Sequence, residues 1–229
     1  MNGLLIVDKP SGPTSHDVVY KVRKWSNERR IGHAGTLDPM ATGVLVLCMG
    51  PATRLAEYLL NGDKRYRAVV RLGQTTDTYD AQGRVLDSRP VDCTPEQIES
   101  ALAAFRGAIE QTPPAFSAIQ VNGQRAYDLA RRGQAPDLKP RAITIHSLTL
   151  VGWSAPDATL EVACSAGTYI RSLAHDLGQA LGCGAHLVAL RRTAAGQFSV
   201  HQAVALDRLR QAFATGDWRR YLRPMDEVL

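Results

Sequence analysis

The run Gly32-His33-Ala34-Gly35-Thr36-Leu37-Asp38-Pro39-Met40-Ala41-Thr42-Gly43 leads directly into the apolar stretch Val44-Leu45-Val46-Leu47-Cys48. Glycines at 32, 35 and 43 permit positive φ and close backbone approach, whereas Pro39 fixes its own φ and restricts Asp38. The pattern predicts one carboxylate held in a fixed loop in front of a buried strand. Asp before Pro is also typical of an ordinary turn, so the wider sequence has to decide between a turn and a reactive acid.

The composition is that of a globular protein with a basic charge balance. Of its 229 residues 45% are hydrophobic, which is enough to bury a sizeable core in one large domain or two small ones. The net charge of +5 and the pI near 9.2 point towards a polyanionic partner, because Lys and Arg displace the counterions condensed on a phosphate backbone. A basic pI alone is weak evidence, so motifs have to identify the partner.

Several common kinds of site lack their sequence signatures. The cysteines at 48, 93, 164 and 183 form no C-x-x-C pair and no two histidines have ligand spacing, so we expect no zinc site, no disulfides and a cytoplasmic location. No signal-peptide pattern and no apolar run near the ~20 residues of a membrane span is found. Phosphate-binding loops, dinucleotide fingerprints and nucleophile elbows are also missing, so we expect chemistry that needs no cofactor.

Apolar periodicity predicts strands interleaved with helices. Capping boxes mark two helix starts, at Thr14 with Asp17 and at Thr94 with Gln97. The first helix has an apolar face made of Val18, Val19, Val22 and Trp25. The other expected elements are strands over 4–7, 44–48, 64–72, 143–148 and 160–164, and helices over 52–60 and 168–181. Because they alternate without a strict βαβ rhythm, they favour a mixed sheet.

Charge is distributed unevenly along the chain. In the strand 64–72, Arg65, Arg67 and Arg71 share one face and Tyr66 lies on the apolar face, where it could be plain core. Residues 75–110 contain more Asp and Glu than Lys and Arg, so we expect them to form a solvated outer face. Residues 112–141 reverse the sign, with five Lys or Arg against two Asp, and are predicted to form a protruding basic lobe.

Two further residues could act with Asp38. Tyr169 and Arg171 lie where a strand passes into a helix, a junction at which side chains often face a cleft. Arg171 could pair with the carboxylate and keep it ionised, or it could be a surface arginine near a helix start. His33 shares the glycine-rich loop with Asp38, but a lone histidine is more often a structural hydrogen-bonding group than a catalyst.

The chain resembles the TruB-type tRNA pseudouridine-55 synthases from Leu4 to about Leu229. The resemblance rests on motifs that occur in the family's order: Asp8-Lys9-Pro10-Ser11-Gly12-Pro13-Thr14-Ser15, the Gly32 to Pro39 run, Lys64-Arg65-Tyr66, Arg71-Leu72-Gly73, Thr76-Asp77-Thr78, Gly167-Thr168-Tyr169-Ile170-Arg171, and Gly184-Ala185-His186-Leu187 with Leu190-Arg191-Arg192-Thr193. It implies the α/β pseudouridine-synthase fold, a central mixed sheet flanked by helices with an active-site cleft. It also implies isomerisation of uridine to pseudouridine in the T-loop of tRNA, without metal or cofactor.

The same resemblance implies roles for individual residues. Asp38 would be the nucleophile, attacking C6 of the uracil or C1′ of the ribose, and Arg171 would form an ion pair with it. Tyr66 would stack on the target base and take part in the final proton removal. The remaining implied site residues are Tyr169 and Leu190 lining the uracil pocket, His33 near the extruded nucleotide, and Lys9 and Pro10 supporting the loop.

The resemblance also sets expectations for organisation and partners. Residues 1–229 would be one catalytic domain, with 112–141 as an RNA-gripping insertion and without the C-terminal RNA-binding domain that many relatives carry after Arg223-Pro224-Met225-Asp226. Phe116 and Gln120 replace the family's usual Tyr and Lys, which puts contacts of that lobe in doubt. We expect a monomer that binds the T-arm of tRNA. Two alternatives stay open: a guide-RNA-dependent synthase subunit and a tRNA-folding chaperone without chemistry.

Overall fold

The computed structural model describes residues 1–121, 123–134 and 136–225. The chain divides into two compact units, the first made of residues 1–66 and 190–229 and the second of residues 67–189. The assignment of 1–229 to one domain stays a prediction. Asp226 and Leu229, at the end of the family resemblance, lie outside the described residues. Among the described residues, no helix has the length and apolarity that a membrane span requires.

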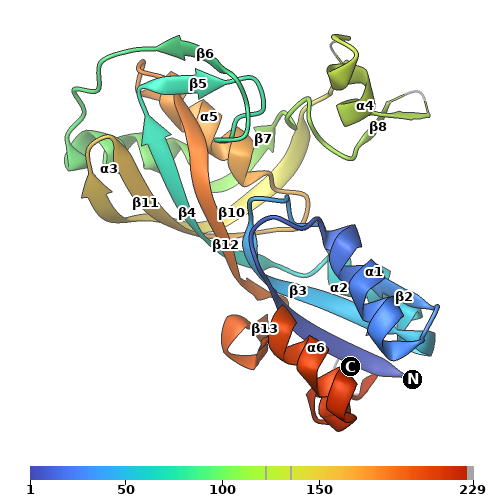
Figure 1. The fold of residues 1–229 in the computed structure, drawn as a ribbon. Helices are drawn as coiled ribbons and strands as arrows, with labels where there is room; N and C mark the ends of the chain where they lie inside the picture. Colours follow the sequence, from blue (N-terminus) through green and yellow to red (C-terminus); the bar gives the residue numbers. More distant parts are fainter. Residues whose placement is uncertain (122, 135, 226–229) are drawn as a thin grey trace. The chain divides into compact units, whose positions relative to one another are not determined.

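The first unit is a small mixed sheet with helices (Figure 1). Its elements are β1 (Gly3–Lys9), α1 (Ser15–Ser26), β2 (Ile31–His33), β3 (Thr42–Met49), η1 (Gly50–Leu55), α2 (Ala56–Leu60), β13 (Phe198–Ser199), η3 (Val200–Gln202), β14 (Val204–Ala205), α6 (Leu206–Thr215), η4 (Asp217–Tyr221) and β15 (Leu222–Arg223). The start of β4 (Lys64–Leu72) and the end of β12 (Ala185–Ala195) also belong to it.

Strand β3 is the centre of this sheet. It pairs antiparallel with β1 from Gly43 to Met49 on one side. Its other side is shared, because β2 pairs antiparallel with residues 47–49 and β12 pairs parallel with Thr42 and Gly43. The chain therefore leaves the sheet after His33 and returns to the same strand edge at Thr42, and this excursion is the Asp38 loop.

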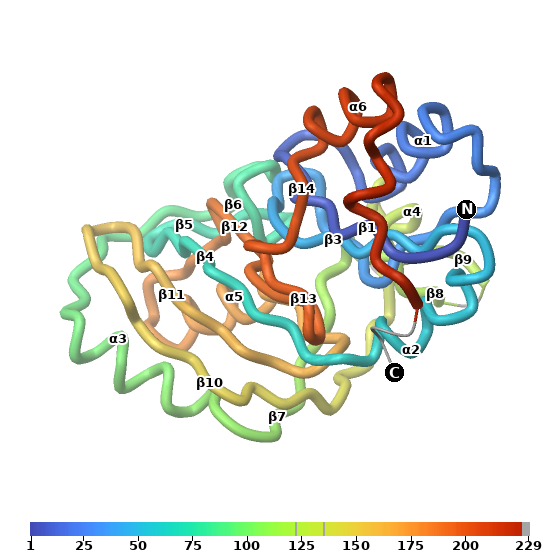
Figure 2. Tube along the Cα trace, turned by 90° about the horizontal axis from the view of Figure 1, so that it is seen from below, coloured from blue at the N-terminus to red at the C-terminus, as the bar shows by residue number. Residues whose placement is uncertain are grey.

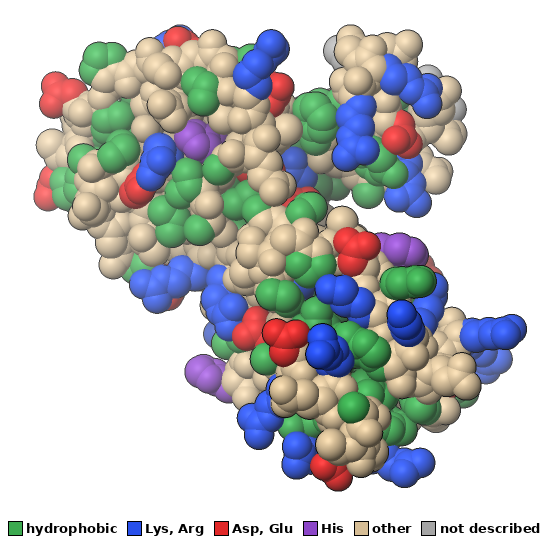
Figure 3. Space-filling view, viewed as in Figure 1, with side chains coloured by type: hydrophobic (Ala, Val, Ile, Leu, Met, Phe, Trp, Pro, Cys, Tyr) green, Lys and Arg blue, Asp and Glu red, His purple; other side chains and the backbone are tan. Residues whose placement is uncertain are grey.

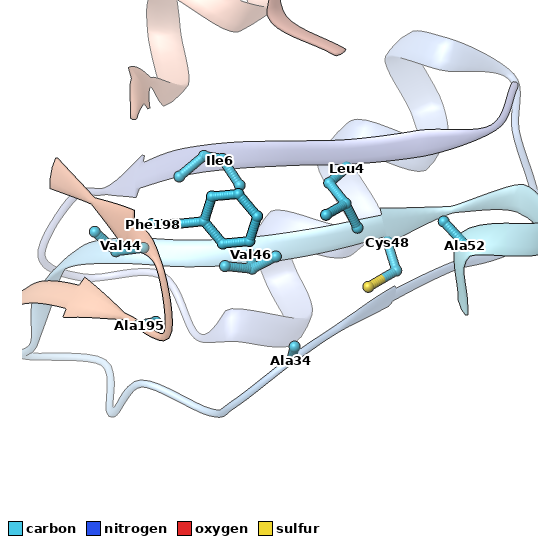
Figure 4. Close-up of a cluster of buried hydrophobic side chains, with 9 residues drawn as sticks. All are labelled: Leu4, Ile6, Ala34, Val44, Val46, Cys48, Ala52, Ala195 and Phe198. Carbon is cyan, nitrogen blue, oxygen red and sulfur yellow. The ribbon is translucent and has the colours of Figure 1, made fainter. Parts of the chain in front are cut away.

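Both faces of β1 and β3 are buried, which explains their continuous apolar sequences. Alternate residues of the two strands form one cluster with Phe198 and Ala34, drawn in Figure 4. The helices α1 and α6 lie on the other side of the strands from α2 and β13 (Figure 2). Trp25 of α1 is half-buried and meets Phe213 of α6 with ring centroids 6.5 Å apart.

The second unit contains an antiparallel sheet with two helices beside it. Its elements are β5 (Gln74–Thr76), β6 (Val85–Ser88), α3 (Pro95–Leu102), η2 (Ala103–Phe105), β7 (Gly107–Gln111), β8 (Gln120–Val121), β9 (Gln124–Arg125), α4 (Ala126–Arg131), β10 (Arg141–Ser154), β11 (Asp157–Cys164) and α5 (Ile170–Ala180), with the rest of β4 and β12. β10 pairs antiparallel with both β11 and β7. α3 packs against β10 and α5.

Local sequence signals agree closely with these elements. Both predicted capping boxes are present, at Thr14 with Asp17 and at Thr94 with Gln97. Ala68, Val70 and Leu72 of β4 are buried, as the alternation predicts. The mixed sheet with flanking helices, the predicted fold class, is confirmed.

Three expectations were wrong in detail. The helix expected over 52–60 is a 3₁₀ turn followed by the short helix α2. The helix expected to begin at Thr168 begins at Ile170, since Gly167 has a φ of 81° and Tyr169 is extended. Gly32 lies in β2 without positive φ and with open space at its Cβ position, so nothing there requires glycine.

Candidate active site

The Asp38 loop, residues 34–41, is shaped by its glycines. Gly35 and Gly43 have φ values of 103° and 100°, the left-handed region that glycine favours. A Cβ on Gly43 would lie 2.2 Å from the main-chain oxygen of Arg192, so the return of the loop to β3 requires glycine. Asp38 itself is half-buried, and its carbonyl accepts a hydrogen bond from the Ala41 N–H at 3.0 Å.

Arg192 fixes the first part of this loop by hydrogen bonds to its main chain. The residue is 1% exposed, and its guanidinium donates to the carbonyls of Gly35 (3.0 Å), Thr36 (3.3 Å) and Val44 (2.7 Å). A planar fork with five donors is the side chain best suited to bind several carbonyls at once. The buried charge of Arg192 is therefore used to fix the backbone on the N-terminal side of Asp38.

Lys9 holds the second part in the same way. Its ammonium, on a side chain that is 0% exposed, donates to the carbonyls of Pro10 (2.9 Å), Pro39 (3.2 Å) and Ala41 (2.7 Å). Burial lowers the pKa of Lys9 to about 8, and the attraction of the Asp38 carboxylate partly opposes that shift. The Lys9 ammonium thus fixes this part of the loop, because three carbonyls accept hydrogen bonds from it.

Ser15 completes the set of groups that hold the loop. Its hydroxyl donates to the Leu37 carbonyl (3.1 Å) and accepts from the Leu37 N–H (2.8 Å). The Gly12 N–H adds a second bond to the Pro39 carbonyl. Every carbonyl from residue 35 to 39 therefore has a donor, and the backbone that carries Asp38 is fixed before any ligand binds.

His33 and Leu190 also lie in this unit. His33, at the end of β2, is half-buried, and burial lowers its pKa, with Arg192 and His16 acting in the same direction. Burial therefore favours the neutral form of its ring. Leu190 is buried beside the start of β3, where its carbonyl accepts from the Thr42 hydroxyl at 3.4 Å. Pro10 is exposed and Tyr66 is half-buried on β4.

Tyr169 and Arg171 belong to the second unit. Tyr169 is the N-cap residue of α5, but its side chain makes no capping hydrogen bond to the helix. Its main chain is instead bound by the Gln111 amide, whose Oε1 accepts from the Tyr169 N–H (2.8 Å) and whose Nε2 donates to the Tyr169 carbonyl (3.0 Å). Gln111 was not singled out for this role from the sequence.

Arg171 is 5% exposed, which rules out a surface arginine. It donates to the carbonyls of Thr78 (3.1 Å) and Phe116 (3.0 Å), and its Nε lies 3.7 Å from Oδ2 of Asp80. Asp80 is itself buried and accepts from the Thr78 hydroxyl at 2.7 Å and from the Gln82 N–H at 3.0 Å. The predicted pair between Arg171 and Asp38 stays a prediction, and Asp80 is a carboxylate partner that the sequence reasoning missed.

The loop that presents Asp80 is held by an aromatic contact. Tyr79 has a φ of 63°, rare for a residue with a side chain, and its ring stacks on His175 of α5 with centroids 3.9 Å apart. The only sequence sign of this loop was the Thr76-Asp77-Thr78 motif, which carried no assigned role.

Comparison with protein families assigns residues 23–229 to one group. Residues 23–170 match the model of the TruB family pseudouridylate synthase N-terminal domain, and residues 171–229 match that of the tRNA pseudouridylate synthase B C-terminal domain.

Curated relatives agree with that assignment. The chain is 49% identical to tRNA pseudouridine synthase B of Pseudomonas aeruginosa (strain UCBPP-PA14) over all of its length and 76% of the relative's. It is 52% identical to the protein of that name from Thermobifida fusca (strain YX), covering 93% of this chain and 75% of the relative. For the protein from Escherichia coli O1:K1 / APEC the identity is 46%, over 92% of this chain and 67% of the relative.

Solved structures show the same fold at lower identity. A Cbf5-Nop10-Gar1 complex contains a chain that matches with a TM-score of 0.77 and 31% identity, and an H/ACA RNP bound to a substrate RNA containing 2′-deoxyuridine contains one with a TM-score of 0.75 and 30% identity. The alignments cover 97% of this chain but only 60% and 59% of those chains. On the sequence matches and this structural agreement, the chain belongs to the TruB family of pseudouridylate synthases.

Proposed function

We propose that this chain isomerises uridine to pseudouridine in tRNA, at position 55 of the T-loop, with Asp38 as the nucleophile. The observation that most supports this proposal is the Asp38 loop, whose backbone is fixed by Lys9, Arg192 and Ser15. The chain that carries this loop is 46–52% identical to enzymes named tRNA pseudouridine synthase B. A preorganised carboxylate is what a nucleophilic step requires, because its orientation is set before the substrate arrives.

The reaction replaces one glycosidic bond by another. The target uridine is flipped out of the folded T-loop at a cost of a few kcal/mol. The Asp38 carboxylate adds to C6 of the uracil or to C1′ of the ribose, and the N1–C1′ bond breaks. The detached base rotates, and C5 bonds to C1′. The bond between Asp38 and the substrate breaks and regenerates the carboxylate, the proton leaves C5 for solvent, and N1 gains a proton. Loss of the C5 proton makes the reaction measurable by tritium release.

The other site residues follow from their family positions and their surroundings. Tyr66 stacks on the flipped base, which contributes about 1–3 kcal/mol against the cost of extrusion, and assists the final proton removal. Arg171 pairs with Asp38 and favours the ionised carboxylate. Tyr169 and Leu190 line the uracil pocket. His33, whose pKa is lowered, places a neutral ring near the extruded nucleotide. The charges of the site then come from other residues.

The basic lobe, residues 112–141, grips the T-arm of the RNA. Lys and Arg side chains gather over its α4 region (Figure 3). Arg125 and Arg131 both lie near the Tyr127 ring, 5.9 Å and 5.5 Å from its centroid, and a hollow of about 400 Å³ beside them is lined by Gln120 and Arg132 among others. Guanidinium groups around an aromatic ring suit phosphates and unstacked bases. The protein would act as a cytoplasmic monomer without metal or cofactor.

The experiment that tests this proposal is tritium release from tRNA transcript labelled with 5-³H-uridine, without guide RNA and without added metal. Wild-type protein should release tritium from the T-loop, and Asp38→Asn should release none while binding tRNA as wild type does. Asp207→Asn, at an exposed position on α6, is the matched control and should be fully active.

The same assay separates the alternatives. Release that requires a guide RNA would favour the guide-dependent subunit, and tight tRNA binding without release by wild-type protein would favour the chaperone. The higher identity to tRNA pseudouridine synthase B than to the Cbf5 chain supports release by the protein alone.

A further inference from the structure

We infer that Gln111 is a positioning residue, which holds Tyr169 and Arg171 in their working places and ties them to the entry of the basic lobe. The inference rests on the proposed function, because it concerns residues to which that function assigns the uracil pocket and the partner of Asp38. It follows from a set of hydrogen bonds that join residues 111–116 to residues 169–172.

Gln111 binds the start of α5 as another strand would. It is the last residue of β7, 3% exposed, and its main chain is fixed by pairing with Arg141 of β10. Its side-chain amide both accepts from the Tyr169 N–H (2.8 Å) and donates to the Tyr169 carbonyl (3.0 Å). A carboxamide has a donor and an acceptor arranged to do both. The anchored end of β7 therefore sets the position of the Tyr169 backbone.

The residues after Gln111 extend this contact to Arg171. The Ser172 hydroxyl donates to the Thr112 carbonyl at 2.8 Å, and Nη2 of Arg171 donates to the Phe116 carbonyl at 3.0 Å. Pro113 and Pro114 lie between these two carbonyls and restrict the backbone there. One stiff segment thus supplies bonds to three of the four residues from 169 to 172.

This segment is also the entry to the basic lobe. Phe116 binds Arg171, and the next residue, Ser117, accepts from the Tyr127 N–H at the start of α4 with 3.0 Å between the atoms. A change in the path of residues 111–116 would move the lobe and the Arg171 guanidinium together. The main-chain pairing of Gln111 with Arg141 keeps that path when only the side-chain amide is lost. Loss of the amide should therefore impair the chemical step more than tRNA binding, since small misplacements of reacting groups can cost about 100-fold in rate.

Gln111→Ala tests the inference directly. At saturating tRNA, the single-turnover rate of pseudouridine formation should fall at least about tenfold, whereas the Kd for tRNA should stay within about twofold. Ser172→Ala should cause a smaller fall of the same kind. Gln179→Ala removes an exposed glutamine from the far end of α5 and should match wild type. Thermal melting of each variant reports the folded fraction.

Gln111→Glu adds a readout that a merely structural role would not move. The introduced carboxylate keeps an acceptor for the Tyr169 N–H but places negative charge against the Tyr169 carbonyl, and burial raises the pKa of such a group. Once protonated, the carboxyl can donate to that carbonyl again. The ratio of wild-type to variant single-turnover rate should therefore shrink as the pH falls from 8 to 6. This variant and Ser172→Ala also carry the test if Gln111→Ala does not fold.

Unchanged single-turnover rates in folded variants would overturn the inference, and so would a weaker Kd with an unchanged rate or a constant ratio across pH for Gln111→Glu. Wild-type protein that releases no tritium would overturn the proposed function and the inference with it. Wild-type release with full activity of the variants would overturn the inference alone, so the two failures are distinguishable.

Discussion

Asp38 and Arg171 are held by opposite means. Asp38 is an acid on a loop, and the buried cations Lys9 and Arg192 direct their donors to the carbonyls of that loop. Arg171 is a cation at a helix start, held by two carbonyls and the Asp80 carboxylate. In the first unit positive charge stabilises the backbone beneath the acid, whereas in the second unit backbone and negative charge stabilise the cation. Preorganisation thus depends on residues that themselves need not touch the substrate.

Arg192→Met should be the most damaging change, because it deletes the donors to three carbonyls of the first unit. Each buried acceptor left without a donor costs about 1–3 kcal/mol, so we expect a loss of about 3 kcal/mol or more in the free energy of unfolding. The Asp38 carboxylate would lose its fixed orientation, and activity should fall at least about 100-fold. Urea unfolding and single-turnover tritium release measure the two effects.

The adjacent Arg191 offers the matched control for that change. It makes an ion pair with Asp8 at 2.8 Å, and its side chain is 41% exposed. Exposed pairs contribute about 0–1 kcal/mol, so Arg191→Met should change the free energy of unfolding little. Equal destabilisation by the two substitutions would contradict the view that Arg192 acts through the loop carbonyls.

Asp80→Asn tests the second unit with a change of charge and almost none of shape. Arg171 would keep its two carbonyl acceptors but lose its buried carboxylate neighbour, so its guanidinium would be held less firmly. We expect the single-turnover rate to fall about 10- to 100-fold, in the range that misplaced catalytic groups produce. The Kd for tRNA should change little.

Asp87→Asn is the control for this substitution. Asp87 pairs with Arg89 on the surface, where both side chains are about half exposed, 48% and 56%. It should leave both the rate and the affinity as in wild type. An Asp80→Asn enzyme with wild-type rate would show that Arg171 keeps its position without the charge of Asp80, and it would contradict the electrostatic part of the comparison between the two units.

Much of the fold could be predicted because its signals are local. Both capping boxes join residues three positions apart, and the alternation over β4 needs no knowledge of the rest of the chain. The glycines and Pro39 around Asp38 likewise predict a fixed loop from neighbouring residues alone.

The supports of the site could not be predicted, because they act across long stretches of sequence. Arg192 reaches Gly35 across 157 positions, and Arg171 reaches Thr78 across 93. Arg192 occurred in a family motif without a role, and Asp80 lay just outside one. Neither residue type nor spacing reveals which carbonyl a buried arginine will find. Gly32 shows the opposite error. It lies close in sequence to Gly35 and Gly43, whose conformations favour glycine, and the sequence suggests the same requirement at Gly32, where the structure shows none.

The smallest expected effect concerns Lys9, whose pKa of about 8 in the folded protein lies well below its ordinary value of 10.5. Between these two values the unfolded chain binds the proton and the folded protein does not, so the free energy of unfolding should rise with pH there. Well below pH 8 both states are protonated and the contribution is constant. From pH 8 to 9 the gain should be about 1 kcal/mol, since a full pH unit is worth at most about 1.4 kcal/mol.

Lys9→Met isolates this contribution from the other groups that titrate in the same range. Urea unfolding of both proteins at pH 7, 8 and 9 gives the difference in their free energies of unfolding. That difference should change little from pH 7 to 8 and move in favour of wild type from pH 8 to 9. A difference that stays level to pH 9 would mean that Lys9 is still charged there, so that its bonds to the Pro10, Pro39 and Ala41 carbonyls, with the attraction of Asp38, outweigh the cost of burying the ammonium.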